Sequence, residues 1–462
     1  MERTTAKKNK YEIDMCNGTI MDKLISFSLP LMLSGILQLM FNAVDIIVVG
    51  RFSGSQALAA VGSTSALINV FTNLFIGISL GANVLTARFY AAGREKEVSE
   101  TVHTAITLAL VSGIVMALVG LVFSRGALAL MGTPDDVIGL SALYMRIYFL
   151  GMPFFMLYNY GAAILRAVGD TKRPLLFLVI AGVINACLNM VLVIVFKLGV
   201  AGVAIATVIS QMISCVLVLR CLCRSESSYR LRFSELGMKG YYLKQIFSVG
   251  VPAGIQSTVI NFSNVLLQSS VNSFGSTAMA GYTAANNLLG FLYVSVNSIT
   301  QACMSFTSQN YGVGKLKRMD RVLADCMILS VVVAVVLGCI CYGFGPEILQ
   351  IYTEDAEVIA CGMEILAYTT ITYFLCGWMD LFPGALRGMG YSAVPMVLSV
   401  IGTVGTRVVW IFGIFPYHRS LAILFISYPA SWIITIILQV VCFYFVRRRV
   451  HRRSQALAGQ EG

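Results

Sequence analysis

Residues 29–50 read LPLMLSGILQLMFNAVDIIVVG, and this stretch indicates the class of the protein. It is long and apolar enough to cross a bilayer as a helix, because about 20 such residues span a hydrocarbon core of about 30 Å. It nevertheless contains one carboxylate, Asp45, and the spacing of Gln38, Asn42 and Asp45 places all three on one helix face. A charge at this depth is costly unless it faces water or a partner. Asp45 is therefore either a structural residue bonded to a neighbouring helix or a titratable functional site, and we favour the functional site.

The composition of the chain excludes a soluble globular protein. Of the 462 residues, 57% are apolar and only 12% are charged, and the mean hydropathy is +0.80, whereas soluble domains carry about 25% charged residues. Long uncharged runs predict an all-α integral membrane protein with about 12 transmembrane helices. The predicted spans are 25–50, 58–90, 101–123, 138–165, 174–196, 201–223, 245–273, 278–311, 320–343, 358–387, 394–416 and 421–446.

The net charge of +11 reflects membrane topology rather than nucleic-acid binding. If the N-terminus is cytoplasmic, most of the basic residues fall in cytoplasmic segments, including 1–23, 224–244 and 447–462. Few of them, such as Arg51 and Lys197, fall at outer ends. The positive-inside rule then places both termini in the cytoplasm. The first 23 residues lack the pattern of a cleavable signal peptide, so we expect a multi-pass protein of the bacterial inner (plasma) membrane.

The 12 cysteines predict no metal site. Most of them lie within apolar runs, none forms a Cys-x-x-Cys pair, and none sits with histidine at ligand spacing. We interpret them as small buried apolar residues.

The two halves of the chain repeat each other at a nearly constant offset. The clearest pairs are SLP at 28–30 and GVP at 250–252, YAAGR at 90–94 and YGVGK at 311–315, and LRAVG at 165–169 and LRGMG at 386–390. Six spans per half is an even number, so both copies cross the membrane in the same direction. Parallel repeats of this kind are typical of secondary transporters, whose substrate path lies between the halves.

The predicted organisation is two pseudo-symmetric six-helix bundles. It comprises a cytoplasmic tail (1–23), an N-lobe (24–223), a basic cytoplasmic linker (224–244), a C-lobe (245–446) and a basic cytoplasmic tail (447–462). The sequence contains no Gly-x-x-x-x-Gly-Lys-Ser/Thr motif, so we do not expect ATP to drive it.

Five segments carry a resemblance to a known family. They are FSLPLMLSGILQLMFNAVDIIVVGRFSGSQALAAVG at 27–62, GANVLTARFYAAG at 81–93, ILRAVGDTKRP at 164–174, LGVAGVAIATVISQ at 198–211 and GALRGMG at 384–390. In these segments, and over 22–446 as a whole, the chain resembles the multidrug and toxic compound extrusion (MATE) transporters, most of all their DinF-like prokaryotic branch. The resemblance implies two six-helix lobes around a V-shaped cleft that alternates access.

The same resemblance implies the activity. It is secondary active efflux of amphipathic, often cationic compounds, driven by the entry of H⁺ or Na⁺. The implied partners are small-molecule substrates and the lipid bilayer, without nucleic acid, without a cofactor other than the coupling ion, and without enzyme activity. We expect a monomer, since nothing in the sequence requires a protein partner.

The resemblance also implies coupling residues in the N-lobe. The first-helix acid of the branch falls on Asp45, and its polar cluster falls on Tyr144, Asn159, Asn185, Asn189 and Thr207. Four of these residues lie about 5–7 residues from the outer ends of their predicted spans, which places them in one layer about 8–10 Å below the outer surface: Asp45, Tyr144, Asn189 and Thr207. The alternative is that the two asparagines 185 and 189 only hydrogen-bond helices together.

The coupling ion stays open between H⁺ and Na⁺. Members of the branch often carry a second carboxylate where this chain has Asn189. A Na⁺ site, whose ligands here would be Asp45, Asn185 and Asn189, needs several oxygens and favours anionic ones. One carboxylate that alternates between protonated and ionised forms suffices for proton exchange, so we favour H⁺.

The C-lobe departs from the better-known bacterial branch, whose seventh helix carries a glutamate where this chain reads Ile260-Asn261. A neutral polar stripe occupies that helix instead, at Ser257, Asn261, Asn264, Gln268 and Asn272. The expected substrate-cavity residues are Gln38, Asn42, Asn261, Asn264, Gln268 and Asp380. Asp380 either pairs with Arg407 as a structural ion pair, which we favour, or is free to bind a cationic substrate.

Two rival functions are weaker. A flippase for a lipid-linked cell-wall precursor would need basic residues in the cavity to hold pyrophosphate, and only Arg146 and Arg407 lie inside predicted spans. A membrane-embedded enzyme would need converging acid and base groups. The three histidines, His103, His418 and His451, instead fall at span ends or in loops.

Overall fold

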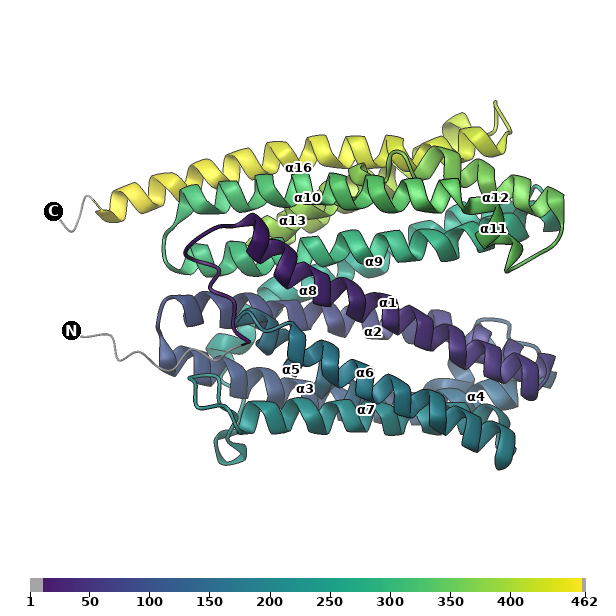
Figure 1. Ribbon diagram of the computed structural model, residues 1–462, viewed down its shortest axis with the longest axis horizontal. Coiled ribbons are helices and arrows are strands. Elements are labelled where there is room, and N and C mark those ends of the chain that lie inside the picture. Colours follow the sequence, from purple (N-terminus) through teal and green to yellow (C-terminus); the bar gives the residue numbers. More distant parts are fainter. Residues whose placement is uncertain (1–10, 459–462) are drawn as a thin grey trace. The chain divides into compact units, whose positions relative to one another are not determined.

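The computed structural model describes residues 11–458, with the side chains of 55, 66, 454 and 456–458 left out (Figure 1). Within these residues the regular structure is helical and no strand is present. The all-α prediction is therefore confirmed. Residues 1–10 of the predicted first tail and 459–462 of the predicted last tail lie outside the described residues.

The first half of the chain contains seven α-helices and one π-helix among the described residues. They are α1 (Met21–Phe52), α2 (Ser55–Ala91), α3 (Glu95–Leu130), α4 (Asp135–Leu150), α5 (Met152–Ala167), α6 (Lys172–Asn189), the π-helix η1 (Met190–Val195) and α7 (Gly199–Cys223).

The second half begins with a short 3₁₀ turn in the linker and ends in a long helix. Its elements are η2 (Phe233–Glu235), α8 (Gly240–Asn272), α9 (Ser276–Gly312), α10 (Leu316–Gly343), α11 (Gly345–Gln350), α12 (Ala356–Thr369), α13 (Tyr373–Gly388), α14 (Ala393–Ser399), the π-helix η3 (Val400–Gly405), α15 (Thr406–Val409), the π-helix η4 (Trp410–Ile414) and α16 (Leu421–Ala458).

Eight helices within residues 11–458 are long and apolar enough to cross a membrane, or ten if each bent pair forms one span. The predicted spans that fail this test are 245–273 and 278–311, which correspond to α8 and α9. Both helices are long, with 33 and 37 residues, so length is not what excludes them. They carry many Ser, Thr, Asn and Gln residues, which lower their hydropathy. The count of 12 spans therefore stays a prediction.

The bends follow the internal repeat. The α4–α5 pair is bent by 47° and the α12–α13 pair by 51°. The first pair begins at Asp135 and the second at Ala356, so the two pairs are separated by the offset of the sequence repeat. In the first pair the break falls at Gly151, two residues before Pro153, which has no backbone N–H to continue the helical ladder.

Glycines at the loops repeat with the same offset. Gly54 and Gly275 have φ angles of +87° and +98°, and Gly169 and Gly390 have φ angles of +97° and +91°. Only glycine enters this left-handed region without steric cost. The two halves therefore share backbone conformations as well as sequence.

The chain forms two compact units. The first comprises Met1–Ile13 and Leu33–Gly254, and the second comprises Asp14–Met32 and Ile255–Gly462. Both α1 and α8 are thus divided between the units, each two residues after a proline, Pro30 or Pro252. The predicted boundaries of the two lobes, 24–223 and 245–446, stay a prediction.

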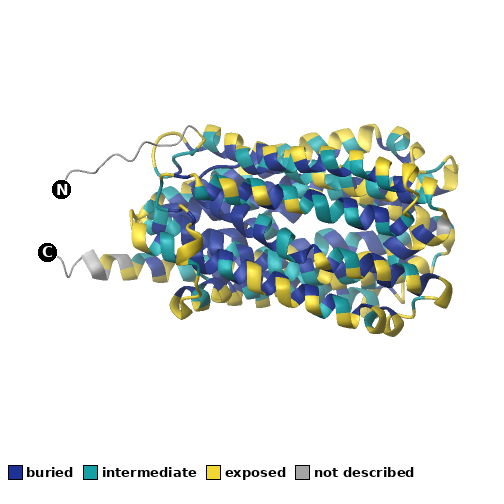
Figure 2. Ribbon diagram, turned by 90° about the horizontal axis from the view of Figure 1, so that it is seen from below, coloured by how far each residue is buried: buried dark blue, intermediate teal, exposed yellow. Residues whose placement is uncertain are grey.

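Each unit has its own apolar core. Phe149 and Tyr160 are fully buried in the first unit, and Tyr282, Phe306 and Phe425 in the second. Exposed positions run along the outer faces of the helices and through the loops, while buried positions gather toward the inside of the helix packing (Figure 2). Many of the exposed side chains are large and apolar, as expected for helices that face lipid.

Candidate functional site

Asp45 lies in a hydrogen-bonded cluster formed by α1, α6 and α7, all within the first unit. Asn189 donates from Nδ2 to Asp45 Oδ1, and also to Asn185 Oδ1 at 3.2 Å. Thr207 Oγ1 lies 3.4 Å from Asp45 Oδ2 and 3.0 Å from the carbonyl oxygen of Val203. We call Asp45, Asn185, Asn189 and Thr207 the Asp45 cluster.

The hydroxyl of Thr207 has one proton and two acceptors within reach. The contact to the Val203 carbonyl is the shorter of the two, so the proton belongs mainly to that bond. The lone pairs of Thr207 Oγ1 then remain available to a donor on Asp45. The hydroxyl can therefore accept from a protonated Asp45 without breaking its bond to the helix.

Asn189 occupies a position where the helix geometry changes. It is the last residue of α6, and the chain continues from it as the π-helix η1. Insertions of π-helix frequently occur at functional positions because they redirect side chains. Asn189 is fully buried, and its Oδ1 has no hydrogen-bond partner among the described residues. A buried acceptor without a partner calls for an explanation.

Two tyrosines of α4 lie within electrostatic range of Asp45. Tyr144 and Tyr148 stack with their ring centroids 6.2 Å apart and their planes 28° apart. Tyr144 is buried, and no hydrogen bond joins it to Asp45 in the described structure. Sequence reasoning included Tyr144 and missed Tyr148, although the spacing of four residues on a helix could have indicated it.

Asn159 is not part of this network. Its Nδ2 donates at 2.8 Å to the carbonyl oxygen of Phe155 in its own helix, α5. Gln38 and Asn42 of α1 are exposed, so their side chains are accessible to a ligand. Of the N-lobe residues that the sequence singled out, Asp45, Asn185, Asn189 and Thr207 are brought together by hydrogen bonds.

The second unit contains a separate buried arrangement around Arg407 of α15. Arg407 Nη1 donates to Ser263 Oγ at 2.8 Å and to Asn264 Oδ1 at 2.7 Å. Its guanidinium carbon lies 4.7 Å from the ring centroid of Tyr428, an arrangement that favours a cation. The hydroxyl of Tyr428 is in turn 2.8 Å from that of Tyr282.

The predicted ion pair between Asp380 and Arg407 is wrong. No ion pair joins them in the described part of the chain, because the guanidinium of Arg407 is taken up by α8 and by Tyr428 of α16. The charge that acts on Asp380 is that of Arg387, which also donates to Gln256 Oε1 at 2.6 Å.

The polar stripe of α8 is partly committed to internal bonds. Asn264 accepts from Arg407, and Gln268 donates to Asn272 Oδ1 at 3.3 Å. Asn261 is exposed and makes no hydrogen bond to a residue that the structure describes. Asn261 is therefore the stripe residue that is free to meet a ligand.

The MatE family model matches residues 30–191 and 252–412, one copy in each half of the chain. The chain belongs to this family of multidrug and toxic compound extrusion (MATE) transporters. The two matched segments start at Pro30 and Pro252, the same prolines that the internal repeat aligns.

Bacterial members of the MATE family are similar over most of their length. The probable multidrug resistance protein YoeA of Bacillus subtilis is 32% identical over 434 residues, which cover 92% of this chain and 93% of YoeA. The multidrug export protein MepA of Staphylococcus aureus is 22% identical over 382 residues, with 82% and 84% covered. The probable multidrug resistance protein NorM of Thermotoga maritima is 26% identical over 393 residues, with 83% of each chain covered.

Solved MATE structures share the fold. An outward-facing multidrug resistance MATE family transporter of the MOP superfamily has a TM-score of 0.87 and 19% identity, with 97% of this chain and 100% of that chain covered. A MOP superfamily transporter from Pyrococcus furiosus has a TM-score of 0.87 and 20% identity, with 96% and 99% covered. A MATE protein in the bent conformation has a TM-score of 0.83.

Proposed function

We propose that this MATE protein is a secondary active efflux antiporter that exports amphipathic, cationic compounds in exchange for protons, with Asp45 as the coupling carboxylate. One observation carries the proposal: the carboxylate of Asp45, within an apolar helix, is held only by the neutral groups of Asn189 and Thr207. No ion pair neutralises it among the described residues. A carboxylate without a counter-ion at membrane depth favours binding a proton or another cation.

Both protonation states of Asp45 find partners in the Asp45 cluster. The ionised carboxylate accepts from Asn189 Nδ2. The protonated carboxyl needs an acceptor, and Thr207 Oγ1 can supply one while it keeps its bond to Val203. Rotation of the Asn189 amide by half a turn would supply another, its unpartnered Oδ1. A cluster that offers a hydrogen-bond partner to both protonation states is suited to a carboxyl group that gains and loses a proton in each transport cycle.

Na⁺ is the second candidate ion, favoured by the unpartnered oxygen of Asn189. The ligand set is poor, however. Asn185 Oδ1 already accepts from Asn189, so Asp45, the single oxygen of Asn189 and the hydroxyl of Thr207 remain. Na⁺ prefers several oxygens, including anionic ones, whereas one carboxylate suffices for H⁺. We therefore place Na⁺ second.

The family and the exposed amides support the proposed substrate class. The relatives are named for multidrug resistance or multidrug export. In this chain Gln38, Asn42 and Asn261 are exposed polar side chains on helices that we propose to span the membrane, and such residues normally face a water-filled path. We propose that Gln38 and Asn42 of the first unit, and Asn261 and Asp380 of the second, contact the substrate, and that Asp380 would attract a cationic compound. We further propose that the protein is a monomer, that both of its termini lie in the cytoplasm, and that it works by alternating access.

Dye transport in proteoliposomes tests this function. Purified protein would be reconstituted, and the movement of ethidium followed after a pH gradient or a Na⁺ gradient is imposed separately. We expect movement with the pH gradient alone, and its loss in Asp45→Asn. Asp136→Asn, which removes an exposed carboxylate at the start of α4, is the matched control and should transport normally.

Each other outcome has a clear meaning. Movement that requires Na⁺ would replace H⁺ by Na⁺ and keep Asp45 as the site. Normal transport by Asp45→Asn would refute the coupling role. No movement with either gradient, in protein with a cooperative thermal transition, would refute efflux and favour a flippase for a lipid-linked cell-wall precursor.

A further inference from the structure

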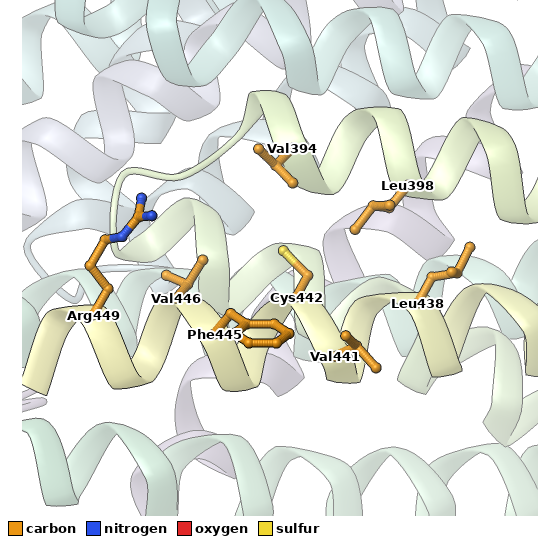
Figure 3. A pocket seen from close by; sticks show the side chains of 8 residues that line it. All are labelled: Val394, Leu398, Leu438, Val441, Cys442, Phe445, Val446 and Arg449. Atoms are coloured by element: carbon orange, nitrogen blue, oxygen red, sulfur yellow. The ribbon is translucent and has the colours of Figure 1, made fainter.

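A groove between α14 and α16 lies outside the residues that the proposed function uses. It has a volume of about 380 Å³ and lies entirely within the second unit. Val394 and Leu398 form its wall on α14, and a row of side chains from Leu438 to Arg449 forms its wall on α16 (Figure 3). Arg449 stands at one end of this row and is the one charged side chain that lines the groove.

The row on α16 follows one face of the helix. Leu438, Cys442, Phe445 and Arg449 are three or four residues apart, so their side chains stack along one side. The same face continues as Arg452 and Arg453 beyond the groove. This face is therefore apolar for several turns and then strongly basic.

The length of the groove matches one leaflet of a bilayer. Arg449 follows Leu438 by eleven positions, and a rise of about 1.5 Å per residue makes this about 16 Å. Half of the hydrocarbon core is about 15 Å thick. A lipid whose acyl chain fills the groove would thus bring its head group level with Arg449.

Arg449 is available to a ligand. It is exposed and makes no hydrogen bond or ion pair with a residue that the structure describes. Its neighbour Arg447 differs, because it donates from Nε and Nη2 to both carboxylate oxygens of Asp320 at 2.6 and 2.5 Å. The charge of Arg447 is neutralised within the protein, while that of Arg449 is not.

We infer that this groove binds an anionic glycerophospholipid, with an acyl chain against α14 and α16 and the phosphate on Arg449. Arginine binds phosphate oxygens through two parallel N–H donors, and Arg452 and Arg453 extend the positive field along the same face. A soluble phosphate compound would leave the apolar wall unused. A neutral or zwitterionic lipid would leave the three positive charges without a net negative partner.

Lipid retention measured by native mass spectrometry tests the site. The full-length protein, delipidated in detergent, would be mixed with equal amounts of phosphatidylglycerol and phosphatidylcholine that carry the same acyl chains. We expect a preference for phosphatidylglycerol in the wild type. Arg449→Gln should lower that preference about fivefold, the factor expected for one basic residue at an anionic surface. Arg449→Lys should keep most of it.

Two further variants separate the charge from the groove. Arg448→Gln removes an exposed arginine that does not line the groove, so its lipid preference should stay at the wild-type value. Val394→Trp fills the groove and keeps every charge, so it should lower the retention of both lipids.

Three results would overturn the inference. The first is equal retention of the two lipids by the wild type, and the second is the same loss in Arg448→Gln as in Arg449→Gln. The third is full displacement of phosphatidylglycerol by millimolar inorganic phosphate, which would show a phosphate site that does not use the groove.

Discussion

At the scale of single residues, the notable feature is the neutrality of the groups around Asp45. Asn189 and Thr207 can each donate a hydrogen bond, and each also has an oxygen that can accept one. A basic residue in either place would hold Asp45 ionised. The neutral partners leave the charge of Asp45 free to change, which is what proton coupling requires.

Replacing Asn189 by alanine tests the importance of its donor. A hydrogen bond to a charged group contributes about 1.5–3 kcal/mol, so we expect Asn189→Ala to slow dye transport driven by a pH gradient at least about tenfold. Asn159→Ala is the control, because that amide bonds only to its own helix, and it should stay within about twofold of wild type. Equal losses in the two variants would contradict a specific role for Asn189.

A double-mutant cycle tests the partners of Arg407. Arg407→Ala should lower the apparent melting temperature in detergent, because Ser263 and Asn264 lose their donor. Combining it with Asn264→Ala should give a coupling free energy of about 1 kcal/mol or more. Combining it with Asp380→Ala should give a value near zero. Rescue of Arg407→Ala by Asp380→Ala would instead restore the ion pair that the sequence suggested.

At the scale of helices, the position of Asp45 depends on how closely α1 approaches α6. The ring of Phe41 lies against Gly182, where an added Cβ would overlap it. Gly182 precedes Asn189 by seven residues, or about two turns of α6. The contact at Gly182 therefore helps to set the separation of Asp45 and Asn189.

Gly182→Ala tests this contact between helices. Inserting a methyl group into a packed interface costs about 1–3 kcal/mol, so we expect a lower melting temperature and slower transport. Gly126→Ala in α3 is the control, because nothing lies within 4 Å of its added Cβ. It should be neutral or slightly stabilising, since alanine favours helix more than glycine by about 1 kcal/mol. Unchanged stability in Gly182→Ala would contradict the close packing.

Glu12 lies in the segment before α1, and two tyrosines of the first unit hold it in place. The carboxylate oxygens of Glu12 accept from Tyr90 Oη and Tyr229 Oη, each at 2.7 Å. Burial, together with the charge of Glu12, raises the pKa of Tyr229 above its ordinary value. The phenol therefore stays protonated, and able to donate, throughout the neutral pH range.

Tyr229→Phe should weaken this attachment. The loss of one hydrogen bond to a charged group, about 1.5–3 kcal/mol, should make the segment before α1 several-fold more sensitive to limited proteolysis. Tyr241→Phe, at an exposed tyrosine of the same region, should cleave at the wild-type rate. Equal cleavage rates in Tyr229→Phe and wild type would refute the role of this bond.

At the scale of the whole molecule, the internal repeat governs the architecture. Three features recur with nearly the offset of the sequence repeat: the bent helix pairs, the glycines with positive φ angles and the two matched family segments. The halves differ in their polar groups. The first unit holds a carboxylate among neutral partners, while the second holds a buried arginine among neutral partners and an aromatic ring.

Cysteine labelling tests whether α8 and α9 cross the membrane. In a cysteine-free version of the chain, Ser273→Cys should react with a membrane-impermeant maleimide added outside intact cells, since residues 273–275 join α8 to α9 and the predicted topology places this connection at the outer face. Ser234→Cys, in the cytoplasmic linker, should react only after the cells are permeabilised. Both positions are exposed. The reverse labelling pattern would contradict the predicted orientation.

The helical class and the repeat follow from the amino-acid sequence alone, and so does the predicted depth of the polar residues. They do so because length, hydropathy and a rise of about 1.5 Å per residue are local properties of a helix. The depth argument placed Asp45, Tyr144, Asn189 and Thr207 in one layer. The structure joins Asp45, Asn189 and Thr207 by hydrogen bonds, but no described hydrogen bond joins Tyr144 to Asp45.

Which side chains meet at a given depth is, by contrast, a property of the tertiary structure. The packing brings Arg407 to Ser263 and Asn264 rather than to Asp380, turns Asn159 back to its own helix, and forms the groove that ends at Arg449. The physical reason is that helical periodicity fixes the height of a residue and the face it shares with its neighbours. It does not fix the rotation of that face about the helix axis, nor the helix that packs against it, because both depend on contacts far apart in the sequence.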